Sequence, residues 1–362
     1  MIIGKIKACT RPYLVDQISL KDLKIDLDPL WPGEKINTSE TLNMPFFELA
    51  QSLKKEIYLT PPIAAKILPK ILYDPQSNLL FTQSKKIIID SSGTVRAKDK
   101  LSQRINLKNL YFQKPEVVEG FSTVFRSFGT EGSHYHILID NLPRFYPLHH
   151  QKYQKIKEIQ ILYSQELNQV ENFFLEKLLP DNARMVKVDK KKFYLTEKFI
   201  FSDFLTRRFF GFLPSIYLDF FVDKVKPNRS RNKQNRIFIS RVTSGTRSGR
   251  CIENEECLFN RLEKYGFKKY ILESLSIEDQ INIFYDAEFV IGTHGAGLTN
   301  IIFSEKIKVL ELFPMPFIKP NYYYLSKSLG HSYLYWCGDQ QSLVSNFSIN
   351  VTEIEEIIKN NL

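Results

Sequence analysis

Hydrophobic and polar positions alternate in blocks over the last third of the chain. Apolar runs rich in β-branched residues predict strands at 236–240, 267–272, 288–292 and 307–313. Between them, apolar residues recur at helical spacing in 254–266 and 276–287, with Gly266 placed to end the first helix and Ser276 to cap the second. Strands separated by helices of this length predict right-handed βαβ units and a parallel sheet.

The first half of the chain has a less regular pattern. Residues 1–60 show no clear period, and 71–90 predicts short strands joined by a turn. From 116 onward strands alternate with helices, with strands expected at 116–125, 158–164 and 184–188 and a helix at 165–179. A helix-like stretch at 134–150 is interrupted by Pro143 and Pro147.

These patterns predict an α/β protein of two domains. An N-terminal domain is expected over 1–225, with an irregular, β-rich start and a Rossmann-like part from about 116. The basic, Asn-rich segment 226–235 is the expected linker. A C-terminal domain is expected over 236–362, and its last helix is a candidate to pack back on the N-terminal domain.

Composition narrows the class of partner. The formal charge is +10 and the isoelectric point about 9.2, which favours an anionic partner such as a nucleotide or a membrane surface. Four dispersed cysteines argue against a disulfide framework or a structural zinc site, which favours the cytoplasm. No run is apolar and long enough to span a bilayer, so a soluble protein is expected. A peripheral contact with anionic lipid stays open, although no strongly amphipathic basic helix supports it.

Residues that suit a phosphate follow the predicted strands of the second half. Ligands of open parallel sheets bind beyond the carboxyl ends of the strands. The residues at these ends include Arg241, Arg247, Arg250, Glu273, Thr293, His294, Gly295, Gly297 and Pro314. Glycines permit unusual backbone angles and close approach, and the helix start at 298 would attract an anion. The alternative, at about even odds from the residues alone, is a tight turn beside solvated arginines.

A second candidate constellation lies in the first half. His136 and Asp140 are four residues apart and share one face of a helix, with Asn141 and Arg144 nearby. A carboxylate beside an imidazole suits a general base. An ordinary pair on a helix surface is the alternative that the residues alone favour. A metal site of His134, His136 and Asp140 has little support, because no other ligand cluster accompanies it.

Several segments together resemble glycosyltransferase family 61, which includes bacterial capsular polysaccharide transferases, plant xylan transferases and animal protein O-linked N-acetylglucosaminyltransferases. They are "HYHILIDNLPRFYPL", "IFISR", the group Arg250, Ile252, Asn254 and Glu255, the run "LSIEDQINIFYDAEFVIGTHGAGLTNIIF", and "VLELFP". The long C-terminal run is the most specific part. The resemblance covers roughly 117–150 and 236–314.

The resemblance implies a GT-B fold, in which two Rossmann-like domains face each other across a cleft. It also implies an inverting reaction with neither a cofactor nor an obligatory metal. The donor nucleotide sugar would bind the C-terminal domain through Arg241, Arg247, Arg250, Asn254, Glu255, Thr293, His294, Gly295, Ala296, Gly297, Asn300 and Glu311. Asp140 is the candidate base, with His136 beside it. The loop before Asn254 is longer than is usual in the family, which leaves open whether Arg247 or Arg250 meets the diphosphate.

We therefore expect a cytoplasmic hexosyl- or pentosyltransferase that uses a nucleotide sugar, most simply a UDP-sugar. Its acceptor would be a polysaccharide, as in capsule synthesis, or a lipid-linked glycan. A dinucleotide-binding oxidoreductase is the alternative, but Asn300 replaces the third glycine of that fingerprint. A nucleic-acid-binding protein is weaker still, because one basic linker is usually a solvated segment.

Overall fold

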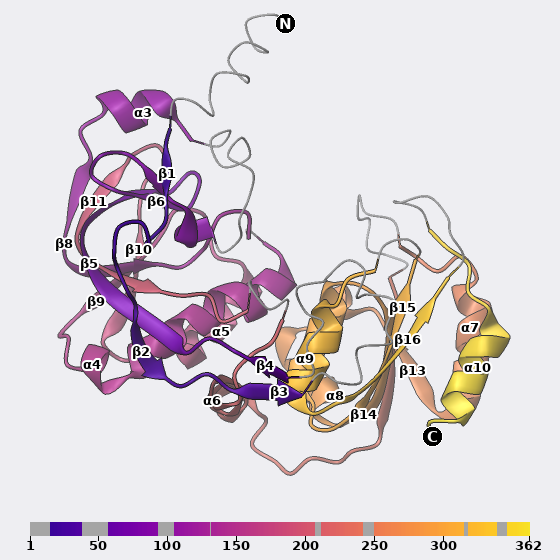
Figure 1. Cartoon of the computed structure of the whole chain (residues 1–362). Coiled ribbons are helices and arrows are strands. Elements are labelled where there is room, and N and C mark those ends of the chain that lie inside the picture. The colour runs from indigo at the N-terminus through magenta and orange to yellow at the C-terminus, as the bar shows by residue number, and fades with distance from the viewer. Residues whose placement is uncertain are drawn as a thin grey trace, which may run out of the picture. The chain divides into compact units, whose positions relative to one another are not determined.

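The computed structural model describes residues 15–37, 57–92, 105–130, 132–206, 211–241, 250–314, 318–338 and 346–362. The chain divides into two compact units (Figure 1). Unit 1 combines Met1–Gly33 with Pro61–Arg208, and unit 2 combines Glu34–Thr60 with Phe209–Leu362. The segment 226–235, for which the sequence predicts a linker, lies within unit 2, and the assignment of functional domains stays a prediction. Each unit combines a sheet with helices, which confirms the α/β class.

Unit 1 is built on a mixed sheet with the order β1-β7-β6-β5-β11-β8-β9-β10, in which β2 also pairs with β5. Its strands are β1 (Gln17–Ile18), β2 (Asp28–Trp31), β5 (Ile63–Asp74), β6 (Leu79–Phe81), β7 (Ile87–Ile88), β8 (Glu116–Val124), β9 (Ile159–Tyr163), β10 (Ala183–Lys187) and β11 (Tyr194–Ser202). Strands β8 to β11 pair in parallel, whereas β5 runs antiparallel to β2, β6 and β11. Numbered along the chain, the four parallel strands lie in the order 3-2-1-4, which is the order of half a Rossmann sheet.

The helices of unit 1 include both helical segments predicted from the sequence, at 134–150 and 165–179. They are the 3-10 helix η5 (Ile89–Ser92), α3 (Leu107–Phe112), the π-helix η6 (His136–Asn141), the 3-10 helix η7 (Leu142–His149), α4 (Gln151–Gln154) and α5 (Gln169–Leu178). The break from η6 to η7 falls next to Pro143, and Pro147 lies inside η7, so the expected interrupted helix is confirmed. α5 begins after Asn168, whose side chain and that of Glu171 form a capping box.

A buried ion pair joins the loop after β8 to α5. Glu171 is fully buried and accepts from Nε of Arg126 at 2.8 Å and from its Nη2 at 2.5 Å. The same guanidinium donates to the carbonyl oxygens of Gln165 and Glu166 at 3.2 and 3.0 Å. Arg126 therefore donates hydrogen bonds both to the carboxylate of Glu171 in α5 and to two backbone carbonyl oxygens just before this helix.

Replacing Glu171 by alanine should lower the free energy of unfolding of unit 1 by about 3–5 kcal/mol, because Arg126 would keep a buried charge without its carboxylate. Urea denaturation monitored by circular dichroism measures the loss. Glu176→Ala, on the exposed face of the same helix, should change stability by less than about 0.5 kcal/mol. Equal losses in the two variants would show that the ion pair has no special role.

Unit 2 is built on a parallel sheet with the order β13-β12-β14-β15-β16. Its strands are β12 (Asn235–Ile239), β13 (Phe267–Tyr270), β14 (Ala287–Thr293), β15 (Lys308–Phe313) and β16 (Ser332–Cys337). The first four match the predicted strands, so the parallel βαβ series is confirmed, while β16 was not predicted. Two short strands, β3 (Lys35–Asn37) and β4 (Ile57–Leu59), form a separate antiparallel pair.

The helices of unit 2 alternate with these strands. They are α6 (Ser215–Val225), α7 (Glu255–Leu262), η8 (Glu263–Tyr265), η9 (Leu272–Ser274), α8 (Ile277–Tyr285), η10 (Ala296–Phe303), α9 (Asn321–Leu329) and α10 (Val351–Lys359). Two predicted signals are confirmed: Ser276 accepts from the backbone N–H of Asp279 at the start of α8, and Gly266 ends η8 with a φ of +78°.

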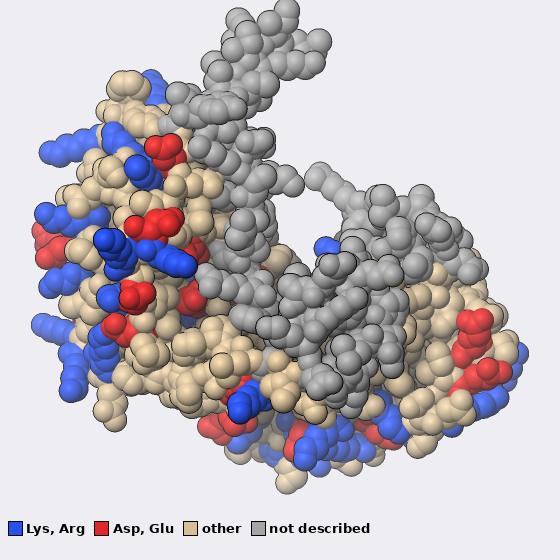
Figure 2. Space-filling model, viewed as in Figure 1, with Lys and Arg blue, Asp and Glu red and all other residues tan. Residues whose placement is uncertain are grey.

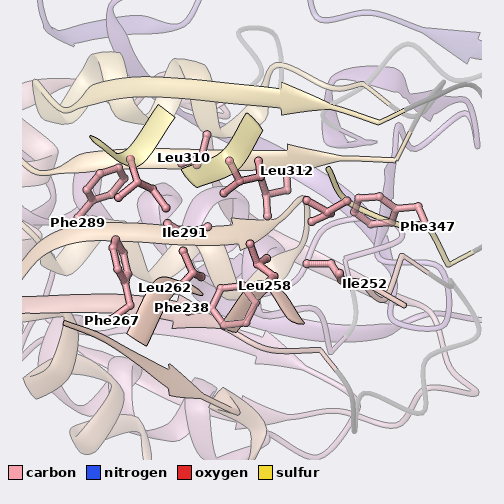
Figure 3. Close-up of a cluster of buried hydrophobic side chains, with 13 residues drawn as sticks. Phe238, Ile252, Leu258, Leu262, Phe267, Phe289, Ile291, Leu310, Leu312 and Phe347 are labelled. Carbon is pink, nitrogen blue, oxygen red and sulfur yellow. The ribbon is translucent and has the colours of Figure 1, made fainter. Parts of the chain in front are cut away.

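One face of the sheet in unit 2 carries a cluster of buried apolar side chains, drawn in Figure 3. Side chains of the inner strands, such as Phe238 and Ile291, meet Leu258 and Leu262 of α7. α10 adds Ile354 and Ile358, both fully buried in this cluster. These two side chains of the last helix thus pack within unit 2, and the expectation that this helix packs back on the N-terminal domain stays a prediction.

The described helices and cysteines bear on whether the chain contains a membrane span or a disulfide. In the described part of the chain, none of the helices combines the length and the apolar character needed to cross a bilayer. Cys251, Cys257 and Cys337 are free thiols, and Cys9 lies outside the described residues.

His331, which precedes β16, is buried in its neutral form. Its Nε2 lies 3.1 Å from the carbonyl oxygen of Ile301, and its Nδ1 accepts from the N–H of Ile307 at 3.4 Å. Burial lowers the pKa of this imidazole to about 4, and the positive charges of Arg231 and Lys233 add to the effect. The neutral ring fits because one nitrogen donates while the other accepts.

Stability that depends on His331 should be lost in acid. An unfolded histidine binds a proton near pH 6.5, whereas the folded one does so only near pH 4. Its contribution is therefore fully present above about pH 6.5 and declines as the pH falls toward 4, by about 3 kcal/mol in all. His331→Gln, which keeps a donor and an acceptor but does not titrate, should lack this component. Unfolding free energies of both proteins between pH 7 and pH 4 provide the measurement, and parallel pH profiles would refute the assignment.

Candidate functional site

Both candidate constellations lie where the strand order of a parallel sheet reverses. In unit 2 the order reverses between β12 and β14, and Arg241 and His294 follow the carboxyl ends of these strands. In unit 1 it reverses between β8 and β11. The loop after β8 leads into η6 with Asp140, and Thr206 follows β11. Crevices at such reversals are the usual ligand sites of open α/β sheets.

Two arginines converge on one backbone carbonyl in unit 2. Arg241 donates from Nη1 to the carbonyl oxygen of His294 at 3.2 Å, and Arg250 donates to the same oxygen at 3.0 Å. Burial lowers the pKa of the Arg250 guanidinium, and the neighbouring charge of Arg241 lowers it further. Arg250 also has a φ of +70°, a strained value for a side chain of this kind. Two like charges held this closely favour the binding of an anion.

Gly295 makes room for one of these arginines. A Cβ at this position would lie 1.7 Å from Nη1 of Arg241 and 2.9 Å from its Cζ. The backbone of Gly295 is extended, with a φ of 175°, so the expectation of an unusual backbone angle there is wrong. The glycine is required because the guanidinium lies against its backbone. At Gly297 a Cβ would instead crowd Leu272 and Ile239, at 3.1 and 3.2 Å.

The side chain of His294 is fixed by hydrogen bonds that run from His294 through Glu311 to Tyr333. Its Nδ1 lies 2.5 Å from Oε1 of Glu311, and the hydroxyl of Tyr333 donates to Oε2 of the same carboxylate at 2.6 Å. Glu311 is fully buried, which leaves its carboxylate committed to these two partners. The His294 ring also stacks on Phe313, with 5.5 Å between ring centroids. The sequence reasoning missed Tyr333 because it lies on the unpredicted strand β16.

The other predicted donor-binding residues have different surroundings. Both polar atoms of the Asn254 amide bind the backbone of Ile349, at 2.8 and 2.9 Å. Glu255 accepts from the hydroxyl of Ser240 at 2.6 Å, and Asn300 donates to Gln280 at 2.9 Å. These three residues support the loops around the two arginines.

In the turn after β14, Ala296, the first residue of η10, is exposed and Gly297 is half-buried. Thr293, by contrast, is buried. Arg247 lies outside the described residues. Of the predicted set, the structure thus brings together Arg241, Arg250, His294 and Gly295, with Glu311 behind them.

The second constellation forms a hydrogen-bonded pair in unit 1. Nδ1 of His136 and Oδ2 of Asp140 are 2.5 Å apart, and Thr206 donates to Oδ1 of Asp140 at 3.1 Å. The Asp140 side chain is only 3 % exposed, whereas that of His136 is 35 % exposed. Asp140 is thus oriented by two partners, and the imidazole is the part of the pair that meets solvent.

The π-helix η6 explains this local geometry. Its wider turn places His136 and Asp140 on one face, and π-helical turns are frequent at functional sites. Neighbouring polar groups brace it: Thr130 donates to the amide oxygen of Asn141 at 3.2 Å, and the buried Arg144 lies over the ring of Phe204. Among the residues that the structure describes, no group of three or more His, Cys, Asp or Glu side chains could hold a metal ion.

Residues 134–310 match the protein-family model described as Glycosyltransferase 61. This stretch includes the His136–Asp140 pair and, in unit 2, Arg241, Arg250, His294 and Gly295, and it ends one residue before Glu311. This match confirms the resemblance to glycosyltransferase family 61 that the sequence shows. No curated protein matches the chain.

The match to this family supports glycosyltransferase activity, with a sugar donor and an acceptor as substrates. The comparisons give no support to an oxidoreductase or a nucleic-acid-binding protein.

Proposed function

We propose that the protein transfers a sugar with inversion from a nucleotide-sugar donor to a hydroxyl of a polysaccharide or a lipid-linked glycan. The observation that carries the proposal is the convergence of Arg241 and Arg250 on the carbonyl of His294, at the reversal of the strand order in unit 2. The diphosphate of the donor would supply the negative charge that this arrangement favours. A UDP-sugar, a cytoplasmic location and the GT-B arrangement remain expectations drawn from the resemblance.

In the proposed reaction the acceptor oxygen forms a bond to the anomeric carbon while the bond from that carbon to the diphosphate oxygen breaks. The arginines stabilise the charge that develops on the leaving nucleoside diphosphate, so no bound metal is required in this proposal. The acceptor proton passes to a base on the opposite side of the sugar.

The His136–Asp140 pair supplies this base in the proposal. The sequence analysis assigns the proton to Asp140, but the burial of this carboxylate favours a different division of roles. His136 exposes its ring and would take the proton, while Asp140 would fix the ring and stabilise the imidazolium. In the GT-B arrangement expected from the resemblance, this pair would face the donor across a cleft.

Nucleotide sugars with different bases and sugars provide the direct test of the function. One donor of the panel should release its nucleoside diphosphate when mixed with the protein and a glycan acceptor. The matching nucleoside diphosphate, most simply UDP, should also raise the melting temperature, because it binds only the folded state. Release of no diphosphate from any donor, together with no thermal shift, would refute the proposal.

Gly295→Ala should weaken binding of the nucleoside diphosphate by roughly tenfold, because the new methyl group displaces the Arg241 guanidinium. Arg241→Ala should weaken it by a similar factor, and the double variant should bind no worse than Arg241→Ala alone. Isothermal titration calorimetry on all three variants measures this. Additive losses would show that Gly295 acts independently of Arg241.

The two members of the base pair can be distinguished by kinetics. Asp140→Asn should lower kcat roughly 100- to 10,000-fold with little change in donor affinity. If His136 takes the proton, His136→Gln should lower kcat as strongly. If Asp140 is the base, the His136 variant should keep most of its activity. Asp181→Asn, at an exposed carboxylate of unit 1, serves as the matched control. Full activity of both pair variants would place the base elsewhere.

A further inference from the structure

Three segments of unit 1 meet around α3, away from the strand ends discussed above. Lys85 donates from Nζ to the carbonyl oxygen of Tyr111 at 3.1 Å, which joins the turn 82–86 to α3. Asn109 of α3 donates from Nδ2 to the carbonyl oxygen of Lys191 at 2.6 Å, which joins α3 to the turn 189–192. The three segments therefore form one continuous surface.

Large apolar side chains are exposed on this surface. Phe112, the last residue of α3, is 86 % exposed, the highest value for a large apolar residue in the described part of the chain. Tyr111 beside it and Val117 on β8 are 40 % and 63 % exposed. A cluster of such residues on a water-soluble surface usually marks an interaction site.

Lysines surround these apolar residues. The segments 82–86, 107–117 and 189–192 carry seven lysines and two acidic residues, a formal excess of five positive charges. One of the acidic residues, Glu116, pairs with Lys192 at 2.5 Å. Figure 2 shows Lys and Arg side chains on the face of unit 1 where Figure 1 places α3.

An apolar groove opens on the same surface. Its volume is about 210 Å³, and Leu110, Phe193 and Leu195 are among the residues that line it. Lys85 contributes to its wall and also lies over the ring of Tyr111, with 5.2 Å between Nζ and the ring centroid. A positive rim around an apolar groove matches an amphiphile with an anionic head group.

We propose that this α3 surface, formed by Lys85, Lys108, Tyr111, Phe112, Lys114 and Val117, docks the protein on an anionic phospholipid bilayer. Phe112 and Tyr111 enter the interfacial region, and the lysines contact anionic head groups. Aliphatic Val117 and the leucine-lined groove favour lipid over a nucleic acid, whose bases would need aromatic platforms and hydrogen-bonding groups. The inference rests on unit 1 alone and does not depend on the proposed transfer reaction.

Vesicle sedimentation tests the proposal with the full chain and without any sugar nucleotide. Wild-type protein should sediment with vesicles of phosphatidylcholine and phosphatidylglycerol but not with phosphatidylcholine alone, and added salt should weaken the binding. Phe112→Ser should weaken binding about tenfold, and the pair Lys108→Glu and Lys114→Glu roughly tenfold or more. The variants of Phe112, Lys108 and Lys114 must keep the melting temperature of the wild type, so that a loss of binding is not caused by unfolding.

Matched controls lie on unit 2. Leu362→Ser removes another exposed apolar side chain, and Lys264→Glu with Lys268→Glu reverses two exposed lysines. These variants should bind vesicles like the wild type. No binding to the anionic vesicles, or equal binding by the α3 variants and the wild type, would overturn the proposal. Binding to an RNA homopolymer that the α3 charge reversal abolishes, without vesicle binding, would identify a nucleic-acid surface instead.

Discussion

The site in unit 2 depends on the contact between the Arg241 guanidinium and the backbone at the end of β14. Arg241 follows β12 and His294 follows β14, so this contact joins the two strand ends between which the strand order reverses. It can form only because residue 295 has no side chain. Arg250 then reaches the same carbonyl from the next loop. The absence of a Cβ at Gly295 thus makes room for the Arg241 guanidinium beside that of Arg250.

The two positively charged guanidinium groups, of Arg241 and Arg250, repel each other at this short distance. The hydrogen bonds from both guanidinium groups to the carbonyl oxygen of His294 offset part of this repulsion. The Glu311 carboxylate acts one step away, because it holds the His294 ring and accepts from Tyr333. Glu311 therefore positions the turn that carries the arginines' acceptor. The resemblance implies that Glu311 also binds the donor, and that role stays a prediction.

The sequence predicted those features that depend on local pattern. Strands β12 to β15 are short apolar runs separated by helical patterns, and Ser276 and Gly266 mark helix ends by their side-chain or backbone chemistry. It could not predict β16, whose tyrosine- and tryptophan-containing segment is only half buried and lacks a clear alternation. The partnership of Tyr333 with Glu311 was hidden for the same reason. Arg126 and Glu171 are 45 residues apart, and no local pattern connects them.

In the two constellations, residues that the sequence motif does not distinguish differ in how far their side chains are buried. The spacing of His136 and Asp140 supports a catalytic role for either residue. In the structure, however, Asp140 is buried and hydrogen-bonded to His136 and Thr206, whereas the His136 ring is partly exposed to solvent. His294 and Glu311 repeat this arrangement at the other reversal, but there both side chains are buried. An imidazole can exchange a proton with a substrate only where its second nitrogen is reachable. On that ground His136 is suited to proton transfer, whereas His294 is suited to holding a backbone carbonyl in place for the arginines.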